Sequence, residues 1–322
     1  MTTSLLACLL TVSPAGVGPT SVTIDPSKFQ PQIVVGKGRV GSLDTFANMI
    51  KRSKAEFAIN GAFFDAYSNR PIRNTVQTLI RDGELINMSD IGSVIGFSES
   101  GQARIGRLKP RIRGKVGTQS WYAYRINNDP SLTSNLAMEF NRFWGTETGF
   151  DGGIQVQVKN GTVTKINRVS TSIPPDGYVL FFKGTEESLG KRFSVGARVT
   201  REVNLDGSPT TFWKKAVTAV GAGPTLVRGG KVVVNAQSEG FNDPKILTGS
   251  GARSMIGVKA NGHIVLAISS GTMSQIAKEM VNLGCVDAMN LDGGASSGLY
   301  ASGKYLRTAG RELTNSLVFV PR

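Results

Sequence analysis

Residues 253–294 have the sequence RSMIGVKANGHIVLAISSGTMSQIAKEMVNLGCVDAMNLDGG, and this stretch decides most of the fold. Two apolar runs, 253–259 and 263–269, flank Asn261-Gly262. An Asn-Gly pair between such runs is a strong signal for a tight turn, so the stretch begins with a predicted pair of antiparallel strands.

A helix and another strand follow this hairpin. Thr272 and Gln275 have the spacing of a capping box, and Gly284 is placed to end the helix. The strand over 286–291 then completes a strand–helix–strand unit over 263–291, whose two strands are expected to run parallel in one sheet. The helix face expected to pack on that sheet consists of Met273, Ile276, Ala277 and Met280.

This geometry predicts a ligand site at one edge of the sheet. A two-residue turn in the hairpin would place Arg253 opposite Ser270. The parallel crossover brings the end of strand 286–291, and hence Asp292, to the same edge. Open sheets tend to bind ligands at the carboxyl ends of parallel strands, and the amino end of the helix near Thr272 favours an anion. We therefore expect an arginine, an aspartate and a helix dipole to face a phosphate there.

The rest of the chain carries mostly strand signals. Ser42 is expected to cap a helix that continues to Lys54, and a strand over 56–59 follows it. Residues 75–235 are predicted to form strands and hairpins. We predict an α+β fold with mixed, largely antiparallel sheets, a C-terminal strand–helix–strand unit and helices packed on the sheet. The turn signals in the middle of the chain include Asn160-Gly161 and Gly229-Gly230, and the inner face of the first helix is predicted to be Leu43, Phe46, Ala47, Met49 and Ile50.

The composition, with 322 residues, 40% hydrophobic residues and 39 glycines, is that of a globular protein cut by tight turns. We expect one domain over 21–322, preceded by a leader or disordered segment over 1–20. The run Ser4–Leu10 resembles the end of an export signal that lacks its positively charged region, and Leu5–Cys8 resembles a bacterial lipoprotein box. We therefore expect a secreted, periplasmic or lipid-anchored protein without a membrane span, while a cytoplasmic location stays open.

The formal net charge of +14 attracts polyanions, including nucleic acid, anionic lipid and phosphate-bearing cell-surface polymers. A solvated basic surface explains the same charge more simply. The densest basic cluster alternates with apolar residues over 104–115, which is typical of an edge strand with a charged face. Zinc-finger spacings and RNA-binding aromatic signatures are absent from the sequence, so no specific nucleic-acid partner is expected.

Several kinds of chemistry are disfavoured by the residues present. The single histidine, His263, excludes multi-histidine metal sites, and no serine–histidine pairing is evident. Cys285 begins a buried strand without a basic partner, which is typical of core packing. We therefore expect no metal and no cofactor.

Two loops at strand ends are candidate sites. Asp292 lies in Asn290-Leu291-Asp292-Gly293-Gly294, and the small, donor-rich loop after it could cradle phosphate oxygens or simply form a capped turn. Asn60-Gly61 also ends a predicted strand. Phe63 and Phe64 behind it could stack on a sugar or fill the core.

Taken together, four blocks of the chain resemble the phosphodiester glycosidase family, which contains a lysosomal enzyme that removes N-acetylglucosamine from phosphate on mannose. The resemblance covers roughly residues 22–320, and four modest blocks in the family's order are specific. Where the family usually shows Asp-Gly this chain has Ser270-Gly271, and Ser254 stands where threonine is common. The identity of a second catalytic carboxylate therefore stays open. The blocks are Ile59–Phe64, Gly221–Gly230, Ala252–Gly257 and Ala288–Ser297.

This resemblance implies a hydrolase that cleaves the bond between a sugar's anomeric carbon and a phosphodiester oxygen, acting on cell-surface or exopolysaccharide-type glycans. Asp292 would be the nucleophile or general base, Arg253 would neutralise the phosphate, and Asn60 would orient the sugar or the phosphate. Asp65 is a candidate for a second acid. Contacts with the substrate are expected from Gly61, Phe63, Phe64, Ser254, Ser270, Asn290, Gly293, Gly294, Ser296 and Ser297.

Two other functions are compatible with the sequence. A non-catalytic binder of anionic polysaccharide or wall polymer would fit the net charge of +14 and the serine at position 270, whereas the intact blocks around Arg253 and Asp292 favour an enzyme. A metal-dependent phosphodiesterase is disfavoured by the single histidine and by the lack of clustered carboxylates.

Overall fold

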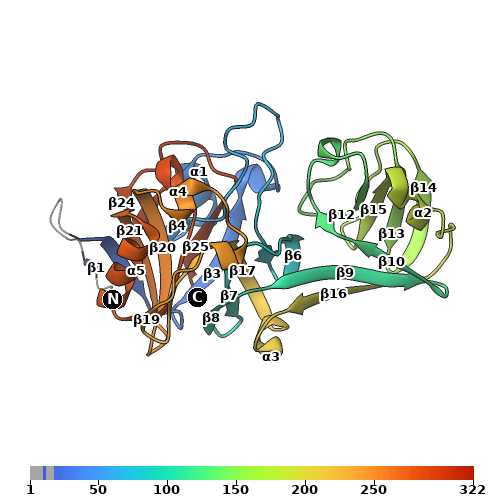
Figure 1. The fold of residues 1–322 in the computed structure, drawn as a ribbon. Helices are drawn as coiled ribbons and strands as arrows, with labels where there is room; N and C mark the ends of the chain where they lie inside the picture. Colours follow the sequence, from blue (N-terminus) through green and yellow to red (C-terminus); the bar gives the residue numbers. More distant parts are fainter. Residues whose placement is uncertain (1–9, 12–17) are drawn as a thin grey trace, which may run out of the picture.

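The computed structural model describes residues 10–11 and 18–322. The expected leader, including Cys8, lies outside the described residues except for Leu10, Thr11 and the last three of its twenty positions. Figure 1 shows a larger lobe on the left and a smaller lobe on the right, joined by the long strands β9 (Lys109–Val116) and β16 (Val199–Asp206). The sheets are mostly antiparallel and the helices few, in agreement with the predicted sheet-rich α+β class.

Two sheets enclose the core of the larger lobe. The seven-stranded sheet has the order β1 (Leu10–Thr11), β2 (Thr20–Ile24), β21 (Ile264–Gly271), β20 (Gly251–Lys259), β22 (Cys285–Asn290), β18 (Thr225–Arg228) and β19 (Lys231–Val232). A five-stranded sheet has the order β24 (Lys304–Arg307), β23 (Leu299–Ala301), β4 (Phe57–Asn60), β25 (Asn315–Pro321) and β3 (Phe29–Val35). Apolar side chains from both sheets are buried against one another, among them Leu266, Met289, Ile59 and Leu317.

We call the paired strands β9 and β16 the ribbon. A third sheet lies between the larger lobe and this ribbon, in the order β6 (Glu84–Asn87), β5 (Leu79–Arg81), β17 (Ala216–Ala222), β7 (Ser93–Ser98) and β8 (Ala103–Gly106). Because side chains alternate along a strand, its two faces enter different cores. Leu79 and Val220 pack into the core of the larger lobe, whereas Ile80 and Ala219 pack into the core that continues into the smaller lobe.

The smaller lobe is built on another five-stranded sheet, in the order β11 (Arg125–Ile126), β12 (Leu136–Asn141), β15 (Gly177–Lys183), β13 (Ile154–Lys159) and β14 (Thr162–Asn167). The ribbon strands β9 and β16 form a three-stranded sheet with β10 (Gln119–Ala123). The helices are α1 (Phe46–Ser53), α2 (Glu187–Gly190), α3 (Thr210–Trp213), α4 (Pro244–Leu247) and α5 (Met273–Asn282), and the 3₁₀ helices are η1 (Gly36–Gly38), η2 (Pro130–Leu132), η3 (Gly184–Glu186), η4 (Gln237–Glu239) and η5 (Gly294–Ser296).

In the C-terminal part of the chain, β21, α5 and β22 follow one another. Both strands pair antiparallel with β20, which lies between them, so β21 and β22 run in the same direction without touching. The capping box at Thr272 and Gln275 is present, and Gly284 follows the helix with φ of +82°. The predicted inner face is buried in full: Met273, Ile276, Ala277 and Met280.

The register of the β20–β21 hairpin differs from the prediction by one residue. Arg253 pairs with Ser269 rather than with Ser270, because the loop has three residues, 260–262, instead of two. Gly262 adopts a φ of +85° at the last position of this loop, a conformation that glycine tolerates and that suits three-residue hairpins. Since paired residues share a face of the sheet, Ser270 lies on the face opposite to Arg253.

The first helix begins later than predicted. Its N-cap is Thr45, whose side chain accepts a hydrogen bond from the backbone N–H of Asn48, and not Ser42. The residues before it cannot be helical because Asp44 forms a β-bridge with Leu313. Of the predicted inner face, Phe46, Met49 and Ile50 are buried, whereas Leu43 precedes the helix and Ala47 is exposed.

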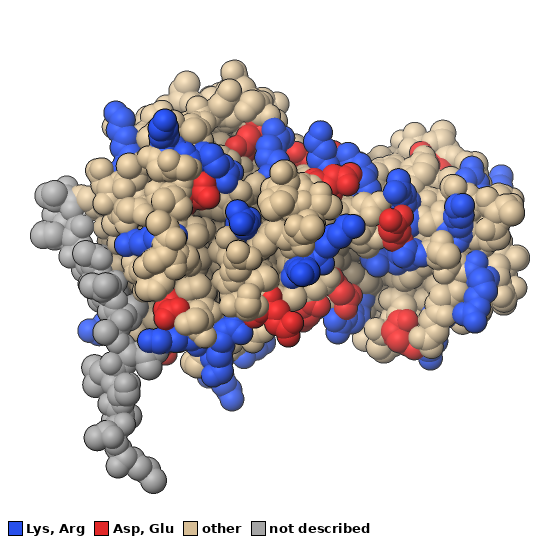
Figure 2. Space-filling view, turned by 90° about the horizontal axis from the view of Figure 1, so that it is seen from below, with Lys and Arg blue, Asp and Glu red and all other residues tan. Residues whose placement is uncertain are grey.

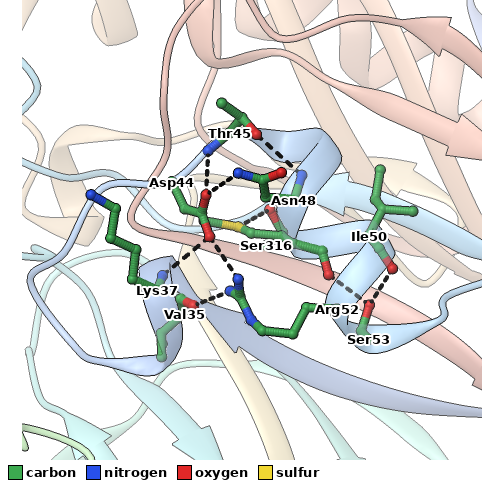
Figure 3. A network of polar contacts seen from close by, with 10 residues as sticks. Val35, Lys37, Asp44, Thr45, Asn48, Ile50, Arg52, Ser53 and Ser316 are labelled. Atoms are coloured by element: carbon green, nitrogen blue, oxygen red, sulfur yellow. Dashed lines mark hydrogen bonds and ion pairs between the residues drawn. The ribbon is translucent and has the colours of Figure 1, made fainter.

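Asp44 links this helix to strand β3 (Figure 3). Its carboxylate accepts hydrogen bonds from Arg52 at 2.7 Å, from Asn48 at 2.9 Å and from two backbone N–H groups. Arg52 also donates to the carbonyl oxygen of Val35 at 2.8 Å. Burial tends to raise the pKa of Asp44, but these hydrogen bonds outweigh it and lower the pKa overall.

The hairpins predicted at Asn160-Gly161 and Gly229-Gly230 are confirmed, with positive φ at all four turn residues. The prediction that the basic cluster over 104–115 forms an edge strand is correct only in part. The cluster spans β8, which is an edge strand, and β9, which lies in the centre of its sheet with alternating exposed and buried residues. Figure 2 shows lysines and arginines over both lobes on one face, with acidic residues among them. No helix among the described residues is long and apolar enough to cross a membrane.

Candidate active site

A cavity of about 650 Å³ opens in the larger lobe beside the end of β22. Three loops supply most of its wall: residues 63–67 after β4, residues 240–253 before and at the start of β20, and residues 292–296 after β22. Arg311 completes the wall. Arg253 and Asp292, which the sequence predicted at one edge of the sheet, both line this cavity.

Asp292 is fixed by three hydrogen bonds. Its backbone N–H donates to the carbonyl oxygen of Gly61 at 3.0 Å, and its own carbonyl accepts from the side chain of Asn60 at 2.6 Å. The Oδ1 atom accepts from the backbone N–H of Gly293 at 2.8 Å. The loop after β22 is therefore tied to the end of β4, a strand of the other sheet.

The Asp292 carboxyl group binds its proton more tightly than an ordinary aspartate. Its side chain keeps partial contact with the cavity, but closely packed protein removes most of its hydration. This burial raises its pKa from 3.8 to about 6, although hydrogen bonds from Ser296 and Gly293 and the positive charge of Arg311 act in the opposite direction. A carboxyl group with such a pKa can exchange a proton near neutral pH.

Arg253 brings a buried positive charge to the same cavity. Only 7% of the residue is exposed. Nη2 donates to the carbonyl oxygens of Lys245 at 2.6 Å and Gly249 at 2.8 Å, and Nε donates to that of Gly271 at 3.3 Å. Burial lowers the pKa of Arg253, and the charge of Asp243 only partly compensates. Among the described residues, no carboxylate forms an ion pair with Arg253, so its charge is available to an anionic ligand.

Asn60 lies behind the cavity and not in its wall, which corrects the expected contact with substrate. The residue is 1% exposed. Its Oδ1 accepts from the Ser254 hydroxyl at 2.7 Å and from the backbone N–H of Gly298 at 3.1 Å, while its Nδ2 donates to Asp292. The carbonyl oxygen and one N–H of the Asn60 side chain thus hold the loop after β22 in place. Ser254 is likewise fully buried, behind Asn60.

Gly61 and Asn290 also support the site from behind. A side chain at Gly61 would meet Oδ1 of Asn315 at 2.0 Å, so only glycine allows this close approach. Asn290 is fully buried and donates to the carbonyl oxygen of Gly223 at 2.8 Å. Ser297 is 1% exposed and does not line the cavity either.

The remaining predicted contacts divide into two groups. Those that line the cavity are Phe63, Phe64, Gly293, Gly294 and Ser296. Ser270 and Asp65 do not line it. Ser270 is exposed beside a different, smaller pocket on the opposite face of the sheet, as the shifted hairpin register requires. Asp65 follows Phe64, and its backbone N–H donates to Asn74.

Among the cavity residues that were not predicted from the sequence, four carry charged or phenolic side chains: Tyr67, Asp243, Lys245 and Arg311. Arg311 donates to the Tyr67 hydroxyl at 3.3 Å and lies 5.0 Å from its ring centre, and Lys245 lies 5.5 Å from the same ring. The hydrogen bond from Arg311 lowers the pKa of Tyr67. Asp243 caps α4 by accepting from the backbone N–H of Lys245 at 2.9 Å, and it brings a second carboxylate to the cavity.

The cavity therefore combines two carboxylates with three cationic side chains and four aromatic rings of the loops: Asp243, Asp292, Lys245, Arg253, Arg311, Phe63, Phe64, Tyr67 and Phe241. Within the part of the chain that the structure describes, no group of three or more His, Cys, Asp or Glu side chains is arranged to hold a metal ion. The arrangement favours an anionic ligand with an apolar face, because the cations can neutralise it while the rings pack against it.

Comparisons with known proteins agree with this picture. The model of a family described as phosphodiester glycosidase matches residues 152–320. A hypothetical protein from Synechocystis has a similar structure, with a TM-score of 0.81 and 23% identity over 94% of this chain and 59% of its own. A Burkholderia pseudomallei protein whose name suggests export has a TM-score of 0.76 and 20% identity over 94% of this chain and 74% of its own.

A third solved structure comes from zebrafish. It is the catalytic domain of N-acetylglucosamine-1-phosphodiester alpha-N-acetylglucosaminidase, auto-inhibited by its pro-peptide, with a TM-score of 0.52 and 13% identity over 94% of this chain and 77% of its own. The chain spans 59% of the length of the Synechocystis protein. No curated protein matches the chain.

Proposed function

This chain belongs to the phosphodiester glycosidase family, and we propose that it hydrolyses the bond between C1 of a sugar and an oxygen of a phosphodiester. Water is consumed, and the products are a sugar with a free C1 hydroxyl and a phosphomonoester. The observation that carries the proposal is the presence of Asp292, with its raised pKa, and Arg253, with its unpaired buried charge, in one cavity.

Asp292 acts in this proposal as the ionised nucleophile or general base. Cleavage of a C1–O bond passes through an oxocarbenium-like state, which a nearby carboxylate stabilises or captures. A phosphate is a good leaving group, so the departing oxygen needs little help from a general acid. Asp243 is the second carboxylate of the cavity and takes the place of Asp65 as the candidate for an assisting acid.

Arg253 binds the phosphate. A guanidinium group makes strong charge-assisted hydrogen bonds to phosphate oxygens, and these are worth more where water is excluded. The backbone N–H groups of Gly294 and Ala295 contribute further donors at the cavity wall. Asn60 acts indirectly, because it holds the Asp292 backbone in place.

The proposed substrate is a phosphate-linked glycan of the cell surface or an exopolysaccharide, and the proposed location is outside the cytoplasm. The net charge of +14 supports an anionic substrate. The signal-like residues 4–10 and the name of the Burkholderia relative support export. Fractionation of cells that express the full chain tests the location, and recovery in the cytoplasm alone would contradict it.

Incubation with a sugar-1-phosphate diester or a UDP-sugar, followed by detection of free sugar, tests the activity. We expect release of sugar by the wild-type chain and a loss of at least about a thousandfold in kcat for Asp292→Asn. The variant should not unfold at a lower temperature, because asparagine keeps the shape of the side chain and removes a buried charge. Wild-type activity in Asp292→Asn would refute the assignment. Binding of the glycan without any release of sugar would identify a non-catalytic binder instead.

A further inference from the structure

A second pocket adjoins the candidate active site. It has a volume of about 880 Å³ and shares two lining residues, Val76 and Ile91, with the Asp292 cavity. Both shared residues are exposed, at 43% and 40%. One wall consists of residues 88–91 after β6, and the other consists of residues 111–113 in β9 and 122–125 at the end of β10. The two pockets therefore adjoin at Val76 and Ile91, and we call them together the groove, which reaches from the cavity to the ribbon strand β9.

Two exposed tyrosines line the second pocket. Tyr122 and Tyr124 are 45% and 42% exposed, and their ring centres lie 6.4 Å apart with an angle of 34° between the rings. The hydroxyl groups are fixed, since that of Tyr122 donates to Glu186 at 2.8 Å and that of Tyr124 to the carbonyl oxygen of Asn135 at 2.9 Å. Adjacent rings that are exposed but immobilised form a surface on which the apolar faces of sugar rings can pack at a low entropic cost.

Cationic side chains lie beside these rings. Arg111 is neutralised by Asp90, with bonds of 2.9 and 3.0 Å, and Arg113 contacts Glu202 at 3.3 Å. Arg125 is exposed and lines the same pocket, and no acidic partner is found for it among the described residues. Among the described residues, the pocket thus offers one cation without an acidic partner next to two aromatic rings, and the exposed carboxylate of Asp206 lies in the wall formed by the ribbon.

The two walls are held in a fixed relation. The buried side chain of Asn128 donates to Asn87 at 2.8 Å, and that of Asn127 donates to the carbonyl oxygen of Ile86 at 3.1 Å. Asn141 donates to the carbonyl oxygen of Leu85 at 3.2 Å. These bonds join the smaller lobe to β6, so the groove is formed before any ligand arrives.

We infer that the substrate is an oligomer or polymer of sugars joined by phosphodiesters, and that the second pocket holds the units next to the bond that is cleaved. The terminal sugar phosphate occupies the Asp292 cavity, and the chain crosses Val76 and Ile91. The following sugar lies on Tyr122 and Tyr124, and a further phosphate pairs with Arg125. This inference rests on the proposed function, and it adds the length and charge of the substrate. A single-stranded nucleic acid also stacks on aromatic rings, but the direct connection to the glycosidase cavity favours a glycan.

Kinetics on two substrates of different length test the inference. The short substrate is a sugar-1-phosphate diester, and the long one is an oligomer of three or more sugars joined by the same linkage. We expect kcat/KM to be at least about tenfold higher for the oligomer, which corresponds to about 1.4 kcal/mol. The double variant Tyr122→Ala, Tyr124→Ala should reduce this ratio to about one, mainly by raising KM for the oligomer, and Arg125→Ala should reduce it in part.

Two residues that line neither pocket of the groove serve as matched controls. Tyr305 is 45% exposed in β24 and Arg104 is exposed in β8, so Tyr305→Ala and Arg104→Ala remove the same side chains elsewhere and should leave the ratio unchanged. Equal kcat/KM for both lengths in the wild-type chain would overturn the inference while the proposed function stands. An equal loss on both substrates in the tyrosine variant would overturn it as well.

If the proposed function is wrong, a binding measurement still tests the groove. If neither substrate releases sugar, binding of the oligomer to the Asp292→Asn chain is measured with and without the tyrosine substitutions. An affinity about tenfold weaker in the tyrosine variant keeps the groove as a glycan site, and an unchanged affinity overturns it. Tighter binding of a single-stranded oligonucleotide of equal charge would overturn the assignment to a glycan.

Discussion

At the scale of single residues, Asp292 and Arg253 each depart from the ordinary state of their side chain, and burial is the largest cause in both. Burial raises the pKa of Asp292 to about 6 and lowers the pKa of Arg253. Both shifts mark a charge that the protein alone does not solvate well. A phosphate-bearing sugar would supply the missing counter-charge for Arg253.

The raised pKa of Asp292 predicts the pH dependence of the reaction. If the ionised carboxylate is the nucleophile or base, kcat/KM rises with pH up to about 6 and then levels off, because protonation below that value removes the reactive form. The phosphodiester keeps its single negative charge over this range, so it does not contribute. Initial rates between pH 4 and 8 check the profile, and a decline in rate with rising pH would assign Asp292 the role of general acid instead.

Arg253 should determine affinity for the phosphate rather than for the sugar. Arg253→Gln is expected to raise KM for a phosphodiester substrate by about tenfold or more, while kcat/KM for an uncharged aryl glycoside stays the same. The guanidinium also bonds to three carbonyl groups, so the assays are run well below the unfolding temperature of the variant. Arg104→Gln is the matched control. Equal losses on both substrates would show that Arg253 only supports the fold.

The place of Asp292 beside the cavity could be predicted from the sequence. Asp292 lies two residues after the end of β22, so its position at this edge of the sheet follows from local pattern and crossover. Tyr67, Asp243 and Arg311 lie in loops without periodicity, and their meeting depends on contacts across the whole chain. Ser270 was misplaced because an Asn-Gly pair fits both a two-residue and a three-residue turn, and a difference of one residue moves a side chain to the other face.

At the scale of secondary structure elements, the sequence predicted the features that depend on residues close together in the chain. The capping box of α5 and the turns at Asn160-Gly161 and Gly229-Gly230 each depend on residues within a few positions of one another. The start of α1 was wrong, because a tertiary bridge between Asp44 and Leu313 holds the preceding residues extended. The central place of β9 also depends on β16, which lies far along the chain.

The network around Asp44 predicts a measurable loss of stability. Asp44→Ala should reduce the free energy of unfolding by about 1–3 kcal/mol at pH 7, since it removes an almost buried carboxylate that accepts several hydrogen bonds. The folded-state pKa of Asp44 is lowered, so its contribution is present above the unfolded pKa near 3.8 and is lost as the pH falls through the lower, folded value.

Urea denaturation of wild type and variant at pH 7 and at low pH measures this difference. Glu312→Ala is a suitable control, because Glu312 is exposed and should change stability by less than about 0.5 kcal/mol. A loss for Asp44→Ala that persists undiminished at low pH would mean that packing around the side chain, and not its charge, provides the stability.

At the scale of the whole molecule, the groove described above extends across both lobes. The cavity with Asp292 belongs to the larger lobe, whereas Tyr122 and Tyr124 belong to the start of the smaller one. No signal in the sequence marks this division, since strand and hairpin patterns continue unchanged through residues 75–235. The separation appears only when the cores are compared, because most strands of the smaller lobe pack into cores distinct from the one between the two sheets of the larger lobe.

The ribbon that joins the lobes affects how this protein can evolve. β9 and β16 pair residue for residue over eight positions, from Lys109 with Asp206 to Val116 with Val199, so the chain enters and leaves the smaller lobe at neighbouring points. A lobe inserted in this way can gain or lose strands over generations without moving β20 and β22, which carry Arg253 and lead to Asp292. Under the proposed function, selection can then change which polymer a lineage recognises while the residues that cleave the bond stay in place.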